Sequence, residues 1–196
     1  MKIGIFPGSF NPVHIGHLAI ANYIVEYEEY DEVWFLITPQ NPLKKKADLL
    51  DQHFRMALLE KTIQGYEKFK INTLEWEIPQ PTYTINTLQK LRMLYPQDEF
   101  VLIIGSDNWD TFHRWKDYQL ILKNFKILIY PRRGSDRIYF NHSNVTLCKN
   151  APKIEASSSF VRKAIEQGKD VRFFLPSGIY NDVVECGFFK REAVDE

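Results

Sequence analysis

The sequence predicts an α/β protein with a doubly wound parallel sheet, and two observations support this fold class. Four short apolar runs are continuous rather than alternating, which is typical of strands that are buried on both faces. Segments with helical spacing lie between these runs, the order expected for a sheet covered by helices on both sides. The four predicted strands are Lys2 to Phe6, Val33 to Ile37, Glu99 to Ile104 and Phe125 to Tyr130.

Apolar stripes with helical spacing mark the segments between the strands. The first stripe follows the first strand, and the second begins after Asp51, a residue type that caps helices. The third begins at Thr84 and ends before Pro96, which cannot continue a helix. A fourth helix is predicted to begin at the serines of 157–159. The first three stripes are Ile15, Leu18, Ala19, Asn22 and Val25; Phe54, Ala57, Leu58 and Ile63; and Ile85, Leu88, Leu91 and Met93.

Length and composition limit the classes of protein that the chain can represent. It has 196 residues, of which 44% are hydrophobic and 26% are charged, enough to bury a substantial core. We expect one domain over residues 1–196, in which the block from Ser157 to Arg162 opens a C-terminal helical part. Basic and acidic residues number 25 each, and this zero net charge argues against a protein that wraps nucleic acid.

Cysteine usage and hydropathy indicate the compartment. Cys148 and Cys186 lie far apart and match no metal-binding or disulfide pattern. The first predicted strand starts at Lys2, which leaves no room for a signal peptide. No apolar run approaches the ~20 residues of a membrane span. These observations predict a cytoplasmic protein that binds no membrane.

The segment that follows the first strand, GSFNPVHIGH over residues 8–17, has the features of an anion site. Gly8 lets the backbone approach a ligand, and the N–H groups at the start of the next helix favour negative charge. His14 and His17 are three residues apart and therefore project from one side of that helix. Gly16 removes a side chain where a base or a ribose could lie close. Two histidines near a helix start are often plain surface residues, but the whole ten-residue pattern favours a binding site.

This pattern resembles the HxGH signature of the nucleotidyltransferase superfamily, and later blocks are most similar to the bacterial nicotinate-nucleotide adenylyltransferases. The blocks occur in the family's order: PQNPLK at 39–44, TYTINTL at 82–88, GSDN at 105–108 followed by Trp115, and SSSFVR at 157–162. The first block indicates only the superfamily, whereas TYT and GSD with Trp115 are typical of the members that act on pyridine nucleotides. Leu43 stands where the family often has His, and the tail ECGFFK at 185–190 lacks the usual tyrosines.

The resemblance implies a Rossmann-like nucleotidyltransferase fold and transfer of AMP from ATP to nicotinate mononucleotide. The products would be nicotinate adenine dinucleotide and pyrophosphate, in NAD biosynthesis. The attacking 5′-phosphate is already an anion at neutral pH, so neither a general base nor a covalent enzyme intermediate is needed. The protein must align two polyanions and neutralise charge at the transferred group. Mg²⁺ is expected with ATP as co-substrate, held by phosphate oxygens and water rather than by a carboxylate cage.

The resemblance also implies roles for individual residues at the phosphates. His17 is expected on the α-phosphate with His14 beside it, Lys44 between the two substrates, and Arg162 on the β- and γ-phosphates. The other expected ATP contacts are Gly8, Ser9, Phe10, Gly16, Gly105, Asp107, Ser157, Ser158 and Ser159. The Asp107 carboxylate would bond a ribose hydroxyl or orient the metal, and both roles are left open. The three serines could serve as a plain helix cap, although capping requires only one of them.

For the acceptor, the resemblance implies that Trp115 stacks on the pyridine ring. It also implies that backbone N–H groups around Tyr83 and Thr84 receive the nicotinate carboxylate. A helix that begins at Thr84 presents its positive end, which suits a carboxylate better than a neutral amide. Trp115 could instead be a core aromatic, because Trp109 and Phe112 are close to it in the sequence.

Other functions would share part of this pattern. Adenylyltransferases for nicotinamide mononucleotide or phosphopantetheine, and cytidylyltransferases, would share the first block. A fragment of a class I aminoacyl-tRNA synthetase would also read HIGH at 14–17, but the short, neutral chain and the SSSxxR block disfavour it. A non-catalytic dinucleotide-binding module would need GxGxxG after the first strand, which the sequence lacks. The sequence leaves open whether the protein is a homo-oligomer and whether Arg132 and Arg133 contact an anion.

Overall fold

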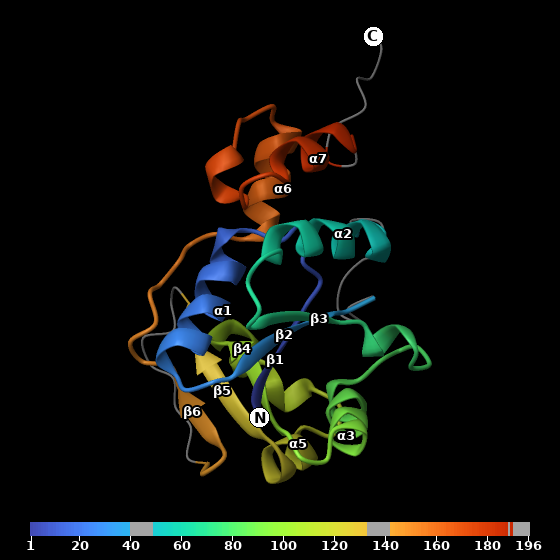
Figure 1. Cartoon of the computed structure of the whole chain (residues 1–196), viewed down its shortest axis with the longest axis vertical. Helices are drawn as coiled ribbons and strands as arrows, with labels where there is room; N and C mark the ends of the chain where they lie inside the picture. The colour runs from blue at the N-terminus through green and yellow to red at the C-terminus, as the bar shows by residue number, and fades with distance from the viewer. Residues whose placement is uncertain (40–48, 133–141, 188, 190–196) are drawn as a thin grey trace.

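The computed structural model describes residues 1–39, 49–132, 142–187 and 189. Within them, six parallel strands form one sheet in the order β3-β2-β1-β4-β5-β6 (Figure 1). The strands are β1 (Lys2–Gly8), β2 (Glu32–Ile37), β3 (Phe69–Asn72), β4 (Glu99–Gly105), β5 (Lys126–Tyr130) and β6 (Val145–Leu147). The chain runs outward from β1 to β3, then crosses to β4 and runs outward the other way. This order confirms the predicted doubly wound parallel sheet.

Helices cover both faces of the sheet (Figure 1). One core cluster joins the sheet to α1 (Ile15–Tyr27), α2 (Gln52–Ile63), α6 (Ser158–Glu166) and α7 (Tyr180–Glu185). A second cluster joins the other face to α3 (Thr84–Leu94) and α5 (Tyr118–Asn124). The short helix α4 (Ser106–Asp110) directly follows β4, and the 3-10 helices are η2 (Leu74–Trp76), η3 (Phe112–Arg114) and η4 (Arg172–Phe174).

The central strand β4 explains why the apolar runs are continuous. Val101 and Ile103 belong to the core cluster under α1, whereas Leu102 and Ile104 belong to the cluster under α3. All four side chains are at most 2% exposed. Burial of each such side chain stabilises the fold by about 1.5–3 kcal/mol, so apolar residues are favoured on both faces of the strand.

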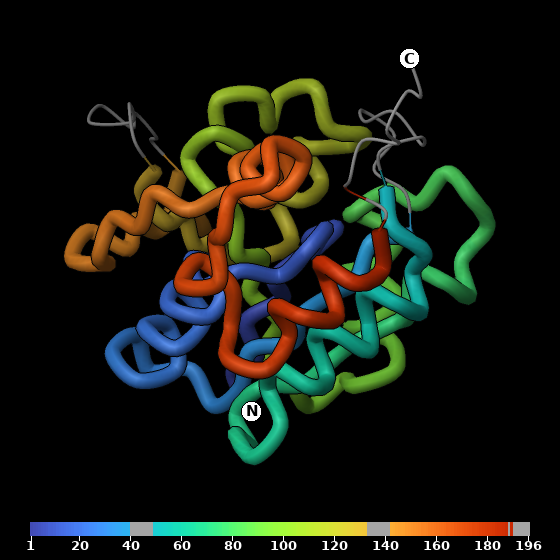
Figure 2. The backbone as a smooth tube through the Cα atoms, turned by 90° about the horizontal axis from the view of Figure 1, so that it is seen from above, coloured from blue at the N-terminus to red at the C-terminus, as the bar shows by residue number. Residues whose placement is uncertain are grey.

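The C-terminal helices share a core with the sheet rather than lying apart from it. As predicted, a helix begins at the serines, because Ser157 caps α6 by accepting a hydrogen bond from the N–H of Phe160 at 3.1 Å. Figure 2 shows α7 running alongside α2, and an ion pair of 2.7 Å joins Lys61 to Asp182 across the two helices. Among the described helices, none has the length and apolar character required to cross a bilayer.

Candidate active site

A pocket of about 500 Å³ lies at the carboxyl ends of the strands, where the sheet reverses its winding direction between β1 and β4. Open α/β sheets bind their ligands at such switch points. Most of the residues predicted from the sequence line this pocket: Gly8, Ser9, Phe10, His14, His17, Tyr83, Thr84, Asp107, Trp115, Ser157, Ser158, Ser159 and Arg162. Lys44 lies outside the described residues, as do Leu43 and Arg133. Gly16 and Gly105 lie near the pocket but do not line it.

The turn after β1 begins at Gly8, where the Phe10 ring leaves no room for a side chain. A Cβ at Gly8 would lie 2.8 Å from the ring of Phe10, which folds back beneath it. Phe10 itself has a positive φ of 43°, a conformation that is uncommon for residues other than glycine. Its ring is buried among Phe6, Phe35 and His17. The packed ring holds this turn in place, with Gly8 and Ser9 facing the pocket.

The two histidines stack on each other at the start of α1. Their ring centroids are 3.7 Å apart, and His14 is only 1% exposed. His14 is the N-cap of the helix, and its Nδ1 accepts a hydrogen bond from the N–H of Gly16 at 3.1 Å. The Nδ1 of His17 accepts one from the N–H of His14 at 3.2 Å. Because Nδ1 is an acceptor in both rings, each neutral imidazole carries its proton on Nε2 and can donate there.

Gly16 lies against two protein groups in the folded chain. A Cβ at this position would lie 3.0 Å from the His14 ring and 3.4 Å from the carbonyl oxygen of Ala156. The absent side chain therefore makes room for the capping imidazole and for the chain that enters α6.

The pKa of His14 gives a testable dependence of stability on pH. Burial, together with nearby Arg132, lowers this pKa from 6.5 to about 3, so the unfolded chain binds one more proton between these pH values. The contribution of His14 to the free energy of unfolding is therefore complete above pH 6.5 and falls by about 1.4 kcal/mol per pH unit below it. We expect His14→Asn, which keeps a good N-cap, to flatten this part of the stability curve in urea unfolding.

The exposed His113 provides the control for this measurement. His113→Asn removes an imidazole that is exposed to solvent, and it should leave the wild-type slope between about pH 3 and pH 6.5 unchanged. Parallel curves for His14→Asn and the wild type would show that the His14 ring is solvated and protonates normally.

The start of α6 is hydrogen-bonded to the loop between β1 and α1. Arg162 donates from Nη1 to the carbonyl oxygen of Asn11 at 2.9 Å and from Nη2 to the Ser159 hydroxyl at 3.3 Å. The Ser158 hydroxyl donates to the carbonyl oxygen of Pro12 at 2.9 Å. These bonds place the N-terminus of α6 beside the histidines, although the two segments are far apart in the sequence. Each serine has a structural contact, and each also lines the pocket.

The start of α3 forms another wall of the pocket. Its N-cap, Tyr83, makes no side-chain capping bond, and Thr82 beside it is buried. Trp115 is half-buried and packs on Phe112, with ring centroids 5.2 Å apart. Phe112 is the core aromatic of this pair, and the larger Trp115 lines the pocket. A helix N-terminus and an indole therefore face the same pocket, an arrangement that suits a planar ring carrying a negative group.

Several residues that line the pocket had no individual role predicted from the sequence, although Thr38, Thr82 and Asn108 stand in or beside the predicted blocks: Thr38, Glu75, Thr82, Asn108, Thr111, Arg114, Lys116 and Tyr130. Arg114 and Lys116 flank Trp115 directly in the sequence. Two cations beside a residue already predicted to bind the acceptor could have indicated that they also face an anionic ligand. Arg132, whose role the sequence left open, also lines the pocket and pairs with Asp107 at 3.1 Å. The pocket therefore combines several cationic side chains with few acidic ones, as a site for polyanions requires.

Arg55 of α2 holds together the loops on this side of the pocket, a role that no sequence motif indicates. Its side chain is fully buried and donates to four carbonyl oxygens, those of Ser9 (2.7 Å), Thr38 (2.9 Å), Leu50 (2.9 Å) and Pro39 (3.1 Å). Burial lowers the pKa of Arg55 to about 10, and the group remains charged at neutral pH. One side chain thereby fixes the ends of β1 and β2 relative to α2.

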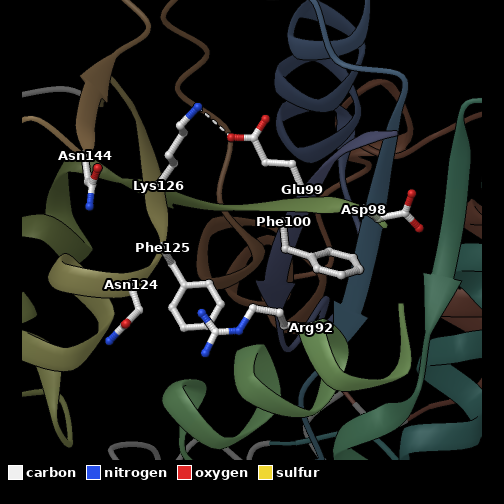
Figure 3. Close-up of a pocket in the computed structure, with 8 residues that line it drawn as sticks. All are labelled: Arg92, Asp98, Glu99, Phe100, Asn124, Phe125, Lys126 and Asn144. Atoms are coloured by element: carbon white, nitrogen blue, oxygen red, sulfur yellow. Dashed lines mark ion pairs between the residues drawn. The ribbon is translucent and has the colours of Figure 1, made fainter. Parts of the chain in front are cut away.

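A second cavity, of about 360 Å³, lies at the amino ends of the strands, near the starts of β4 and β5 (Figure 3). Its charged groups already have partners. Lys126 pairs with Glu99 at 2.6 Å, Asp98 pairs with the N-terminal amine at 2.8 Å, and the Arg92 guanidinium lies 4.9 Å from the centre of the Phe125 ring. This cavity lacks the helix N-termini and histidines of the first, which is therefore the candidate active site.

Comparisons with known proteins agree with the fold and identify the family. Residues 5–164 match the cytidylyltransferase-like family. A relative from Azobacteroides pseudotrichonymphae, named "Probable nicotinate-nucleotide adenylyltransferase", is 60% identical over 94% of this chain and 97% of its own length. A relative of the same name from Bacteroides fragilis is 47% identical over 94% of this chain and 92% of its own length.

Solved structures with low sequence identity share the fold. A nicotinic acid mononucleotide adenylyltransferase from Plasmodium falciparum, complexed with NaAD, has a TM-score of 0.81. It is 21% identical and the match covers 96% of this chain and 97% of that one. The chain belongs to the cytidylyltransferase-like family and, within it, to the nicotinate-nucleotide adenylyltransferases.

Proposed function

We propose that the protein joins AMP, taken from ATP, to the 5′-phosphate of nicotinate mononucleotide. The observation that supports this most strongly is that the N-termini of α1, α3 and α6 meet at one pocket at the switch point of the sheet. Helix N-termini favour anions, and this reaction brings together a triphosphate, a phosphate and a carboxylate. The 60% identity to a relative named as such an enzyme supports the same reaction.

In the proposed reaction, an oxygen of the acceptor phosphate attacks the α-phosphorus of ATP. The new P–O bond forms as the bond to the β-phosphate oxygen breaks, and pyrophosphate leaves with that electron pair. The proton on Nε2 makes His17 a donor to the α-phosphate oxygens, where charge rearranges in the transition state. His14 holds the start of α1 and donates beside it, while Arg162 and the serines of 157–159 bind the β- and γ-phosphates. Lys44 is proposed to neutralise charge between the substrates.

Mg²⁺ is proposed to enter with ATP. Of the described residues that line the pocket, Glu75 and Asp107 carry carboxylates. In the described part of the chain, no group of three His, Cys, Asp or Glu side chains could hold a metal ion. This donor set fits an ion held mainly by phosphate oxygens and water, with Asp107 as the side chain that would meet it. When bound, the ion neutralises charge on the leaving pyrophosphate.

The acceptor is proposed to lie between Trp115 and the start of α3, with its carboxylate at the N–H groups of Tyr83 and Thr84. We further propose that residues 1–196 work as a single domain in the cytoplasm, where Cys148 and Cys186 remain free thiols. No nucleic-acid partner is proposed, and the site is built from one chain whether or not the protein forms homo-oligomers.

Pyrophosphate release from ATP with a panel of acceptors tests this proposal. We expect turnover with nicotinate mononucleotide, weaker turnover with nicotinamide mononucleotide, and none with phosphopantetheine. The first two acceptors differ only in the acid or amide on the ring, and the helix N-terminus prefers the anion. Faster release with the amide would contradict the choice of acceptor, and turnover with CTP in place of ATP would contradict the choice of nucleotide.

A further inference from the structure

Glu75 is a carboxylic acid enclosed beneath the acceptor end of the pocket, and the proposed reaction does not use it. It lies in η2, is only 4% exposed, and lines the pocket with Thr82, Tyr83 and Thr84. Its Oε1 accepts a hydrogen bond from the hydroxyl of Thr87, near the start of α3, at 3.0 Å. The Thr38 hydroxyl lies near the carboxyl group, but Oε2 has no partner with hydrogen-bond geometry among the described residues. An unpaired buried oxygen is costly, so Oε2 requires either a donor from a ligand or a proton of its own.

The surroundings of Glu75 favour its neutral form. Burial raises the pKa of Glu75, and this effect outweighs the hydroxyls of Thr87 and Thr38, which lower it. The titratable and charged groups on the elements around it and across the pocket are His14, His17, His53, Arg55, Glu77, Tyr83, Lys90, Asp107, Arg114, Lys116, Tyr130, Arg132 and Arg162. Burial and the two hydroxyls account for the shift, and none of these charged groups contributes to it.

The two forms of the Glu75 side chain have opposite hydrogen-bonding properties. A neutral carboxyl has an O–H that can donate to a carboxylate on the ligand, whereas an ionised one only accepts. A ligand carboxylate at the start of α3 would further disfavour the ionised form, because like charges at close range do not both ionise readily. A carboxamide has N–H donors of its own and pairs equally well with an ionised Glu75.

We propose that Oε2 of Glu75 distinguishes a carboxylate from a carboxamide on the acceptor ring, by donating a hydrogen bond to the carboxylate. This inference rests on the proposed function, since it requires the pyridine ring to lie between Trp115 and the start of α3. Glu75 contacts the substrate far from the reacting phosphorus, so it determines specificity and takes no part in the bond exchange. The N–H groups at Tyr83 and Thr84 attract the anion, and Glu75 makes that attraction dependent on pH.

The test compares kcat/KM for nicotinate mononucleotide with that for nicotinamide mononucleotide, from about pH 5 to about pH 9. Both acceptors carry the same ribose and phosphate, so the acid-to-amide ratio cancels the titration of those groups and of ATP. In the wild type, we expect this ratio to fall by about tenfold per pH unit once Glu75 ionises. Glu75→Gln keeps a neutral N–H donor of the same shape, so its ratio should not change with pH.

Two further variants separate recognition from folding. Glu77→Gln removes a neighbouring carboxylate that is exposed, paired with Lys90 at 3.7 Å and absent from the pocket lining, and it should keep the wild-type slope. Glu75→Leu removes the donor and should lower kcat/KM for the acid by about 10- to 100-fold, with a smaller loss for the amide. A variant that only weakened the fold would lower turnover of both acceptors equally and leave their ratio unchanged.

The outcomes distinguish this proposal from the proposed function. A wild-type enzyme that turns over both acceptors with a pH-independent ratio would overturn the role of Glu75 alone. So would a Glu75→Gln variant that keeps the wild-type slope. A wild-type enzyme that turns over neither pyridine nucleotide would overturn the proposed function, and the role of Glu75 with it.

Discussion

Replacing His17 with alanine is expected to lower kcat by about two to four orders of magnitude, as removal of a transition-state donor does. The Nδ1 of His17 is occupied by the backbone N–H of His14, so its Nε2 carries the proton that the α-phosphate oxygens would receive. An interaction made mainly in the transition state lowers kcat and kcat/KM together and leaves ATP binding nearly intact. Steady-state kinetics and an ATP titration of the variant measure these quantities.

The structural loss from this substitution is small, which keeps the kinetic result interpretable. Alanine removes the hydrogen bond from the N–H of His14, worth about 1 kcal/mol, and the ring contacts with His14 and Phe10, so the melting temperature should fall by several degrees while the protein stays folded. His142→Ala removes an exposed imidazole that does not line the pocket, and it should keep wild-type kinetics. A His17→Ala enzyme with unchanged kcat and a raised KM for ATP would show that His17 only binds the ground state.

Arg55→Met is expected to have the largest effect on stability. It removes a side chain that donates to the carbonyl oxygens of Ser9, Thr38, Pro39 and Leu50. Leaving several buried acceptors without donors should lower the free energy of unfolding by about 3–5 kcal/mol, even though a buried charge is also removed. Because the same bonds hold the ends of β1 and β2, KM should rise for both substrates. Urea unfolding and steady-state kinetics measure the two effects.

Arg172→Met is the matched control for Arg55→Met. Arg172 pairs with Asp170 at 2.6 Å, but its side chain is 57% exposed and solvent screens the pair, so its removal should cost little stability. Arg55→Lys should recover part of the loss, since it keeps the charge but cannot reach all four carbonyl groups. An Arg55→Met protein within about 1 kcal/mol of the wild type would show that the four carbonyl groups do not depend on this side chain.

The strands that the sequence predicted are those with neighbours on both sides. Burial on both faces produces a continuous apolar run, as in β4, and such a run is visible without a structure. The edge strands β3 and β6 were not predicted, because each is short and pairs with a single neighbour. Their sequences, FKIN and VTL, contain too few apolar residues to stand out from a loop. The short helices α5 and α7 were not predicted either.

The residues of the candidate site were predictable where they form a local motif. The histidines, the serines before α6 and the start of α3 belong to such motifs, and all of them line the pocket. Glu75 and Arg55 have no motif, because their burial results from helices and loops that pack over them only in the folded chain. The contact of Gly16 with the His14 ring was not predicted, because it depends on a rotamer that the sequence does not specify.

A crystal structure with nicotinate adenine dinucleotide bound would show whether the histidines and the three helix N-termini form the site of AMP transfer. We expect the phosphates that join the two nucleosides to lie within hydrogen-bond distance, about 3 Å, of Nε2 of His17. We also expect the pyridine ring to lie against Trp115, with its carboxylate at the N–H groups of Tyr83 and Thr84. A product bound in the cavity beside Arg92, or one whose phosphates lie away from both histidines, would contradict the account.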